Sequence, residues 1–178
     1  METATTPESI CNLLARSRLM TPDEVRNLRQ RWLREAGVKA PDTAQFGKWL
    51  VANQFVTDYQ AGRLLKGHSD HYFFNDYKLL DRIGLGRMAG VYKGIHKLGQ
   101  VVAIKVLPPS KGKDAEAFGR FQREARIALR LKHPNVVRSF QTDVAESLHY
   151  IVMEYLDGET LEEVLKRHGR SPRRRVED

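Results

Sequence analysis

The sequence predicts an α+β fold, in which a small all-α bundle precedes a five-stranded antiparallel sheet with one long helix packed on it. Two observations carry this prediction. Up to position 67, apolar residues recur at helical spacing, whereas after position 76 the chain breaks into short strand-like runs. One longer stretch with helical spacing interrupts those runs. We expect a helical domain at 1–68, a linker at 69–76, a sheet domain at 77–166 and a basic tail at 167–178.

Two helix starts are marked by capping boxes. Thr21 and Thr57 are suitable N-cap residues, and Glu24 and Gln60 follow them by three positions. In a capping box, the threonine hydroxyl and the Glu or Gln side chain accept hydrogen bonds from each other's backbone N–H groups. Pro22, directly after the first cap, favours the first helical position. These signals predict helices that begin near positions 22 and 58.

Two further helices complete the first part. The stretch Ile10–Leu19 is one and another follows Asp42, while Gly37 and Gly67 are expected to end helices. Together these make about four helices over roughly 60 residues, a length at which an independent core is marginal. We expect that core to gather around three aromatic residues, Trp32, Phe46 and Trp49.

The second part alternates between strand-like runs and one long helix. The expected strands are Tyr77–Ile83, Val91–Lys97, Val101–Leu107, Val136–Thr142 and His149–Tyr155. Asp114 is expected to begin the long helix, which should end before His133 and Pro134. A further helix begins near Leu161. The packing face of the long helix is predicted to hold Phe118, Phe121, Ala125 and Ala128.

The positive charge of the chain says little about its partners. The formal net charge is +8, but residues 166–178 alone contain 6 Lys+Arg and 2 Asp+Glu. The rest is spread evenly, with +2 over 1–70 and +2 over 71–165. A basic tail can contact nucleic acid or an acidic membrane surface, although a solvated tail is the more common case. We expect no specific nucleic-acid partner.

Composition excludes several other classes of protein. No run approaches the roughly 18 apolar residues of a membrane span, and the start of the chain lacks the pattern of a secretory signal. Cys11 is the only cysteine, which excludes an internal disulfide and a cysteine-built zinc site. We therefore expect a cytoplasmic protein with no metal site and no membrane span.

A glycine-rich turn joins the first two expected strands. Gly84, Gly86 and Gly90 allow backbone N–H groups to approach phosphate oxygens closely. A dinucleotide-binding loop would be followed by a helix, but a strand follows here. The turn alone is a weak signal, because glycine-rich turns are common in hairpins.

Val-Ala-Ile-Lys at 102–105 adds a lysine to an apolar strand. Because side chains alternate along a strand, Val102 and Ile104 should face one way and Ala103 and Lys105 the other. A lysine there is costly unless it is paired, and Glu124 on the long helix is a candidate partner. Lys105 taken alone favours the alternative, in which the lysine reaches solvent from the edge of the sheet.

Five motifs in one order resemble the small lobe of a protein kinase. They are the glycine-rich turn, Val-Ala-Ile-Lys, a helical Phe-Gln-Arg-Glu, Leu-Lys-His-Pro-Asn-Val-Val and Tyr-Ile-Val-Met-Glu-Tyr-Leu-Asp-Gly. The resemblance covers about residues 77–166 without interruption, and it is to bacterial eukaryotic-like (Hanks-type) serine/threonine kinases. It implies a kinase small lobe after the helical bundle, and a family reaction that transfers the γ-phosphate of ATP to protein Ser or Thr.

The resemblance also implies roles for individual residues. Lys105 would hold the α- and β-phosphates of ATP, and Glu124 would fix Lys105 through an ion pair. Met153 would lie at the back of the pocket, and the backbone of Glu154 and Leu156 would bind the adenine edge. The adenine would lie between Ile83, Val91 and Ala103. The loop over the phosphates would consist of Gly84, Leu85, Gly86, Arg87, Met88, Ala89, Gly90 and Val91.

Two departures from the family pattern matter. Ala89 stands where the third loop glycine is usual, and Gly90 follows one place later, so we expect a stiffer or shifted loop. From Tyr77 onward there is no His-Arg-Asp, Asp-Phe-Gly or Ala-Pro-Glu motif, so the base for the substrate hydroxyl and the principal Mg²⁺ ligand are missing. We expect this truncated lobe to bind ATP weakly and to transfer no phosphate, with Mg²⁺ bound only in an intact relative.

Two interpretations of function stay open from the sequence. In the first, the chain is a truncated serine/threonine kinase with a helical domain and an ATP-binding lobe. In the second, it is a non-catalytic interaction or regulatory protein, in which the helical domain binds a partner beside a kinase-lobe remnant. An exposed apolar patch expected around Val91, Ala103 and Met153 would favour a protein partner or self-association through that face.

Overall fold

Four short helices occupy the first part of the chain. The computed structural model describes residues 6–36, 42–85 and 90–169, without the side chains of Leu85 and His168. The helices are α1 (Pro7–Arg16), α2 (Pro22–Ala36), α3 (Thr43–Ala52) and α4 (Asp58–Leu65). The helical character and the number of helices predicted for this part are confirmed.

Both predicted capping boxes form. The Thr57 hydroxyl accepts a hydrogen bond from the Gln60 N–H at 3.2 Å, and Gln60 Oε1 accepts one from the Thr57 N–H at 3.1 Å. Thr21 and Glu24 make the same exchange at 3.3 and 2.6 Å. Just after α4, Gly67 has a φ of +81°, the left-handed conformation that commonly ends a helix.

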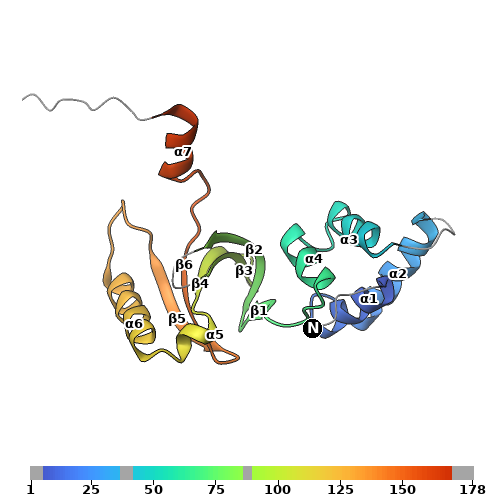
Figure 1. Ribbon diagram of the computed structural model, residues 1–178, viewed down its shortest axis with the longest axis horizontal. Helices are drawn as coiled ribbons and strands as arrows, with labels where there is room; N and C mark the ends of the chain where they lie inside the picture. Colours follow the sequence, from blue (N-terminus) through green and yellow to red (C-terminus); the bar gives the residue numbers. More distant parts are fainter. Residues whose placement is uncertain (1–5, 37–41, 86–89, 170–178) are drawn as a thin grey trace, which may run out of the picture.

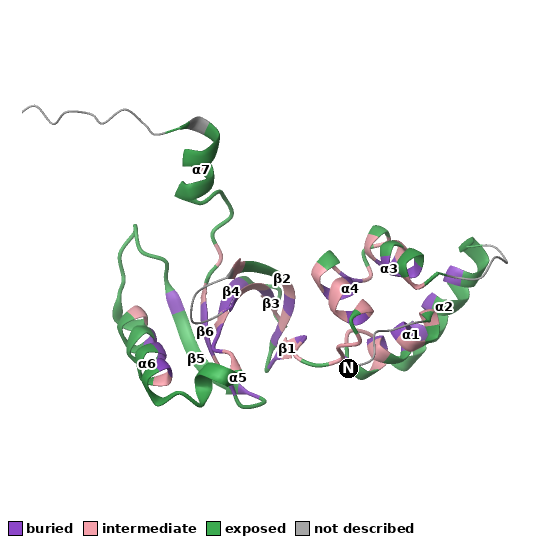
Figure 2. Ribbon diagram, viewed as in Figure 1, coloured by how far each residue is buried: buried purple, intermediate pink, exposed green. Residues whose placement is uncertain are grey.

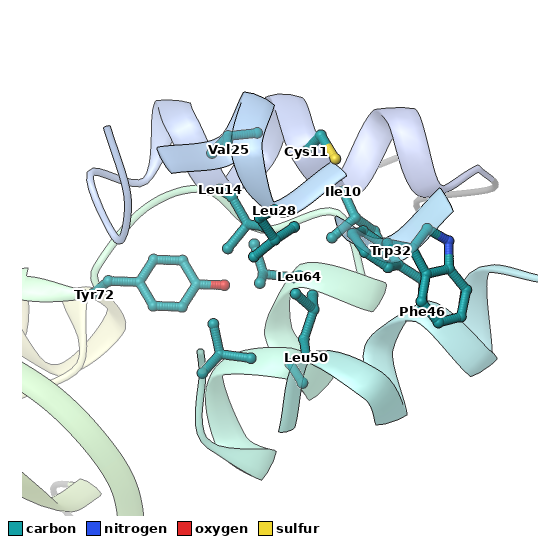
Figure 3. Packing of buried hydrophobic residues seen from close by; sticks show 12 residues of the cluster. Ile10, Cys11, Leu14, Val25, Leu28, Trp32, Phe46, Leu50, Leu64 and Tyr72 are labelled. Carbon is teal, nitrogen blue, oxygen red and sulfur yellow. The ribbon is translucent and has the colours of Figure 1, made fainter. Parts of the chain in front are cut away.

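The aromatic core predicted for the helices is confirmed. The ring centroid of Trp32 lies 5.3 Å from the centroids of both Phe46 and Trp49. Phe46 is fully buried and Trp32 is 6% exposed. Gly37, expected to end α2, lies outside the described residues. Figure 3 shows the aliphatic side chains that pack in the same cluster, among them Ile10, Leu14, Val25, Leu28, Leu50 and Leu64.

Antiparallel strands follow and form one curled sheet of order β1-β2-β3-β4-β6-β5 (Figure 1). They are β1 (Phe73–Phe74), β2 (Tyr77–Leu85), β3 (Gly90–His96), β4 (Val101–Val106), β5 (Ser139–Ala145) and β6 (Leu148–Glu154). The helices of this part are α5 (Pro109–Gly112), α6 (Ala115–Arg130) and α7 (Leu161–His168). The predicted α+β class is confirmed, with the two-residue strand β1 and the short helix α5 as additions.

β5 begins later than the sequence predicts. The expected strand was Val136–Thr142, but the ladder with β6 begins at Ser139. The Val136 N–H donates to the His133 carbonyl at 3.1 Å, so this valine belongs to a turn. Val136 and Val137 are exposed by 43% and 41%. The strand preference of two β-branched residues is therefore overridden by local turn hydrogen bonding.

The two faces of the sheet are covered differently. Figure 2 shows that most of β5 is exposed, whereas the neighbouring β6 is mostly buried or half-buried. On one face, Val102 and Ile104 join a core that the curl of the sheet encloses. On the other face, α6 packs through Phe121 and Ala125, as predicted, whereas Ala128 is only half-buried. In Figure 1, α6 lies beside β5 at one end of the sheet and the four N-terminal helices lie at the β1–β2 end.

The stretch at 69–76, expected to be a linker, contributes to both cores. Tyr72 is 1% exposed and belongs to the helical core. Phe74 is 2% exposed and belongs to the sheet core. The two parts of the chain are thus joined by buried aromatic residues.

The last described helix, α7, extends away from the sheet in Figure 1. It begins with a further capping box, in which the Thr160 hydroxyl accepts from the Glu163 N–H at 3.3 Å. None of the helices in the described ranges is long and apolar enough to cross a membrane.

Candidate functional site

β4 places a lysine on the face of the sheet that α6 covers. Val102 and Ile104 are buried in the core inside the curled sheet, with 1% and 0% exposed. Lys105 is half-buried and forms an ion pair with Glu124 of α6. The alternation predicted for Val-Ala-Ile-Lys is therefore present.

The Lys105–Glu124 ion pair joins β4 to α6. Lys105 Nζ donates to Glu124 Oε1. The lysine side chain is 21% exposed and the glutamate side chain 53%, so the pair lies at the rim of the interface between helix and sheet. Because solvent screens such a pair, it orients the lysine but contributes little stability. The alternative of an unpaired lysine at the sheet edge is excluded by this contact.

The packing of α6 determines where Glu124 lies. The helix is capped by Asp114, whose Oδ1 accepts hydrogen bonds from the N–H groups of Glu116 at 3.0 Å and Ala117 at 3.2 Å. The hydrogen bond from Ala117 is the main cause that lowers the pKa of Asp114. Phe121, 3% exposed, lies one turn before Glu124 and anchors this face of the helix to the sheet.

Three apolar residues lie on the same face of the sheet as Lys105. Val91 lies opposite Lys105 in the β3–β4 ladder, and Met153 lies opposite Ala103 in the β4–β6 ladder. Directly opposite residues of an antiparallel pair share a face, so these side chains form an apolar floor beside the lysine. Ala103 is 6% exposed, and Val91 and Met153 are half-buried.

The exposed apolar patch expected around Val91, Ala103 and Met153 is therefore wrong. Met153 packs partly into the core between α6 and the sheet and Ala103 is 6% exposed, so little of this surface is open to solvent. Exposed apolar side chains lie instead between α6 and β5 and after β6. Those that are at least 41% exposed in these segments include Leu131, Val136, Val137 and Leu156. Phe140, in β5 itself, is 39% exposed.

The structure describes both ends of the glycine-rich turn. Gly84 pairs with Val91 and Leu85 with Gly90, so the turn closes the hairpin of β2 and β3. Ile83, just before the turn, is 45% exposed. Outside the described residues lie the side chain of Leu85 and all of Gly86, Arg87, Met88 and Ala89.

The expected hinge follows β6 directly. The Glu154 N–H donates to the Arg138 carbonyl at 2.8 Å. An adenine contact at Glu154 would therefore have to use the carbonyl of that residue. Leu156, two residues later, is 60% exposed, and its backbone lies beyond the last paired residue of β6.

Sequence reasoning missed Lys93, a second lysine on this face. It lies opposite Ala103 in the β3–β4 ladder, and its Nζ lies 4.4 Å from the ring centroid of Tyr155 in the expected hinge. The signal was available, because Lys93 follows Val91 by two positions on one strand and such residues share a face. Two cations therefore border the apolar floor.

This arrangement suits a flat apolar group that carries phosphates. The floor can bind a planar ring, and a lysine oriented by a carboxylate can bind a phosphate oxygen. Within the described ranges, no group of three or more His, Cys, Asp or Glu residues could hold a metal ion. The chemistry available from these residues is thus binding and orientation.

Comparison with known proteins identifies relatives for the sheet-containing part of the chain. The family described as Protein kinase domain matches residues 77–178, a range that includes the segment expected to be a basic tail. The probable serine/threonine-protein kinase PknB of Lactococcus lactis subsp. lactis is 43% identical over 99 residues, which are 54% of this chain. The serine/threonine-protein kinase PrkC of Bacillus subtilis is 42% identical over 94 residues, or 52% of this chain.

A mycobacterial relative gives the same result. The serine/threonine-protein kinase PknB of Mycobacterium leprae is 40% identical over 101 residues, or 54% of this chain. The chain covers only a small part of these proteins: 16% of the Lactococcus and Mycobacterium relatives and 14% of the Bacillus relative. The resemblance inferred from the five motifs, to bacterial serine/threonine kinases, is confirmed.

Proposed function

Because the chain belongs to the protein kinase domain family, we propose that residues 77–166 are the ATP-binding lobe of a serine/threonine protein kinase. The ion pair between Lys105 and Glu124 is the observation that carries the proposal. A kinase needs both residues in contact so that the lysine can hold the α- and β-phosphates. In this chain the contact follows from the packing of α6 against the sheet.

The apolar floor beside Lys105 is a suitable surface for the adenine ring of ATP. We propose that the ring lies between Ile83, Val91 and Ala103, with Met153 at the back of the slot. Val91 and Ala103 share the face of Lys105, so a ring on the floor would direct its phosphates toward the ammonium. The carbonyl of Glu154 and the backbone of Leu156 would bind the ring edge. The turn from Gly84 to Gly90 would cover the phosphates.

We propose that these 178 residues by themselves transfer no phosphate. Their sequence contains no aspartate in a His-Arg-Asp motif to accept the proton of the substrate hydroxyl, and no Asp-Phe-Gly aspartate to bind Mg²⁺. The described residues also offer no group of three or more His, Cys, Asp or Glu side chains that could hold a metal ion, so they do not fit a bound Mg²⁺. Nucleotide binding should be weak, with a Kd of about 1 mM or higher, because the lobe supplies only one wall of the slot.

Nuclear magnetic resonance titration with ATP tests the binding site. We expect amide shifts to move together at Ala103, Met153 and Glu154, with little change in α1. Lys105→Ala should weaken this response. Lys97→Ala is the matched control, because Lys97 carries the same charge and pairs with Asp76 at 2.9 Å in a different turn. Shifts confined to other basic surfaces, or a response that Lys105→Ala leaves unchanged, would contradict the proposed site.

Calorimetry and a transfer assay test the remaining parts. A low-micromolar Kd for ATP would overturn the expectation of weak binding. Phosphate transfer from labelled ATP to a protein substrate, lost in Lys105→Ala, would overturn the proposed inactivity of the isolated chain.

A non-catalytic interaction role is the second candidate. The exposed apolar side chains between α6 and β5, among them Leu131, Val136 and Val137, favour it because such surface is usually covered. Self-association is the simplest form of this role, and light scattering measures it directly. A monomer at high concentration would count against self-association.

A further inference from the structure

β2 contains a bulge whose backbone carbonyls accept hydrogen bonds from side chains in the helical part of the chain. In the ladder with β3, Leu79 lies opposite Gly94 and Asp81 lies opposite Lys93, so Leu80 is an extra residue without a cross-strand partner. A bulge residue of this kind leaves the ladder and needs another hydrogen-bond partner. The Leu80 carbonyl finds it in the Thr57 hydroxyl of the α4 cap, at 2.5 Å.

The neighbouring carbonyl is bound by the other member of the same capping box. Gln60 Nε2 donates to the Leu79 carbonyl at 2.6 Å, while Gln60 Oε1 accepts from the Thr57 N–H. Gln60 is 1% exposed, which is unusual for a glutamine and makes its hydrogen bonds costly to lose. The two side chains that begin α4 therefore also hold two successive carbonyls of β2.

α4 also contacts the second strand of the same hairpin. The Tyr59 and Tyr92 ring centroids lie 5.9 Å apart, which joins α4 to β3. Tyr92 lies two residues after Gly90, where the glycine-rich turn returns to the sheet. A Cβ at Gly90 would come within 3.0 Å of the Tyr92 ring, so the turn and this ring are closely packed. The Arg82 guanidinium of β2 also lies over the Tyr92 ring, with Cζ 5.8 Å from the ring centroid.

We infer that the α4 capping box is a clamp that holds β2 and β3 in the register the glycine-rich turn needs. Thr57 and Gln60 are then positioning residues for the nucleotide site, although they lie outside the kinase lobe. The clamp itself follows from the contacts above, and only its effect on nucleotide binding rests on the proposed function. By thermodynamic reciprocity, a nucleotide that binds more tightly to the clamped hairpin should also protect α4.

Gln60→Glu separates the clamp from the cap. A glutamate keeps an oxygen that can accept from the Thr57 N–H, so the capping box can persist. Once ionised, a glutamate has no proton to donate to the Leu79 carbonyl, so the clamp is broken. Because burial disfavours the ionised form, the variant is compared at rising pH until the carboxyl group has lost its proton. Thr57→Ser keeps the hydroxyl and should preserve both roles. Ser9→Ala is the matched control, because it removes the corresponding side chain from the capping box of α1.

Hydrogen exchange of the full chain measures the clamp without any nucleotide. In Gln60→Glu, we expect the amides around the bulge, from Leu79 to Arg82 and at Lys93, to exchange at least about tenfold faster than in the unchanged protein. Thr57→Ser and Ser9→Ala should leave these amides unchanged. If Gln60→Glu leaves them unchanged, or if Ser9→Ala accelerates them as much, the clamp does not exist.

Titration with ATP measures the effect on the site. In the unchanged protein, ATP should slow exchange in α4, and Gln60→Glu should remove this protection and weaken binding several-fold. ATP that shifts the Ala103 amide in both proteins, with equal affinity and without protecting α4, would refute the positioning role while leaving the proposed function intact. If ATP binds neither protein at the floor, the proposed function and the positioning role both fail, but accelerated exchange in Gln60→Glu would still establish the clamp.

Discussion

Tyr72→Phe should make the stability of the protein less sensitive to alkaline pH, because the Tyr72 phenol is buried between the two parts of the chain. The side chain is 1% exposed in the helical core. Its hydroxyl donates to the His68 carbonyl at 3.1 Å and lies 3.4 Å from the Gln60 carbonyl. Burial, partly opposed by the nearby Arg63 guanidinium, raises the pKa of Tyr72 from 10.0 to about 12.

The sign of the effect follows from the direction of this shift. Since the folded-state pKa is the higher one, the unfolded chain loses the phenol proton first as pH rises. The stabilising contribution of the neutral phenol is therefore complete below pH 10 and is lost between 10 and 12. The free energy of unfolding should fall by up to about 1.4 kcal/mol for each pH unit in that window.

The free energy of unfolding of Tyr72→Phe depends on pH in a different way. Phenylalanine leaves the His68 carbonyl without its donor, which should cost about 1 kcal/mol at pH values near 8. It has no proton to lose, so it avoids the loss of about 1.4 kcal/mol that the phenol causes by pH 11. The stabilities of the two proteins should therefore converge and cross near pH 11.

Urea unfolding followed by circular dichroism, at several pH values from about 8 to 11, measures both curves. Other titrating groups contribute equally to the two proteins and cancel in the difference. A difference in the free energy of unfolding that stays constant across this range would refute the reasoning, because it would mean that Tyr72 titrates alike in the folded and unfolded chains.

Four further substitutions test separate parts of the structure. Thr21→Ala should lower the free energy of unfolding by about 1 kcal/mol through loss of the α2 cap, measured by urea unfolding. Ile104→Ala should cost about 3 kcal/mol because the side chain is fully buried in the sheet core. Ile127→Ala, at a residue 53% exposed, should cost less than about 1 kcal/mol in the same assay. Lys105→Met should change the free energy of unfolding by no more than about 1 kcal/mol, since the Glu124 side chain is 53% exposed. The same substitution should weaken ATP binding. A large loss of stability would contradict the view that the ion pair orients the lysine without stabilising the fold.

Local signals in the sequence were sufficient for most of the helices and strands. Capping residues such as Thr57 act within three positions, and the alternation of Val102, Ala103 and Ile104 depends on one strand only. Glu124 was a candidate partner for Lys105 because a lysine in an apolar strand needs a partner, and the resemblance of five ordered motifs then implied the same pair. These features depend on interactions that a short stretch of chain already specifies.

Of the features that were missed, one depends on a turn close by in the chain and another on a partner far along it. Val136 has the side chain of a strand residue, but the turn from His133 decides its conformation. The hydrogen bond from Gln60 Nε2 to the Leu79 carbonyl could not be predicted, because its acceptor lies 19 positions away in the sequence. That carbonyl is accessible at a bulge that no residue type in β2 signals. A buried glutamine next to a complete capping box was the one unusual feature, and burial is known only from the fold.

The ion pair is better understood as a consequence of how α6 packs than as its cause. Lys105 and Glu124 are both accessible to water, and an attraction between such groups is small compared with the burial of Phe121 and Ala125 on the same helix. The position of the carboxylate is therefore set by the apolar contacts of α6, while the position of the ammonium is set by β4. The clamp from α4 acts on the opposite end of the same sheet, through β2 and β3. The lysine and the glycine-rich turn are thus positioned by two separate sets of buried contacts, and a change in either set can alter nucleotide binding without touching a residue of the site.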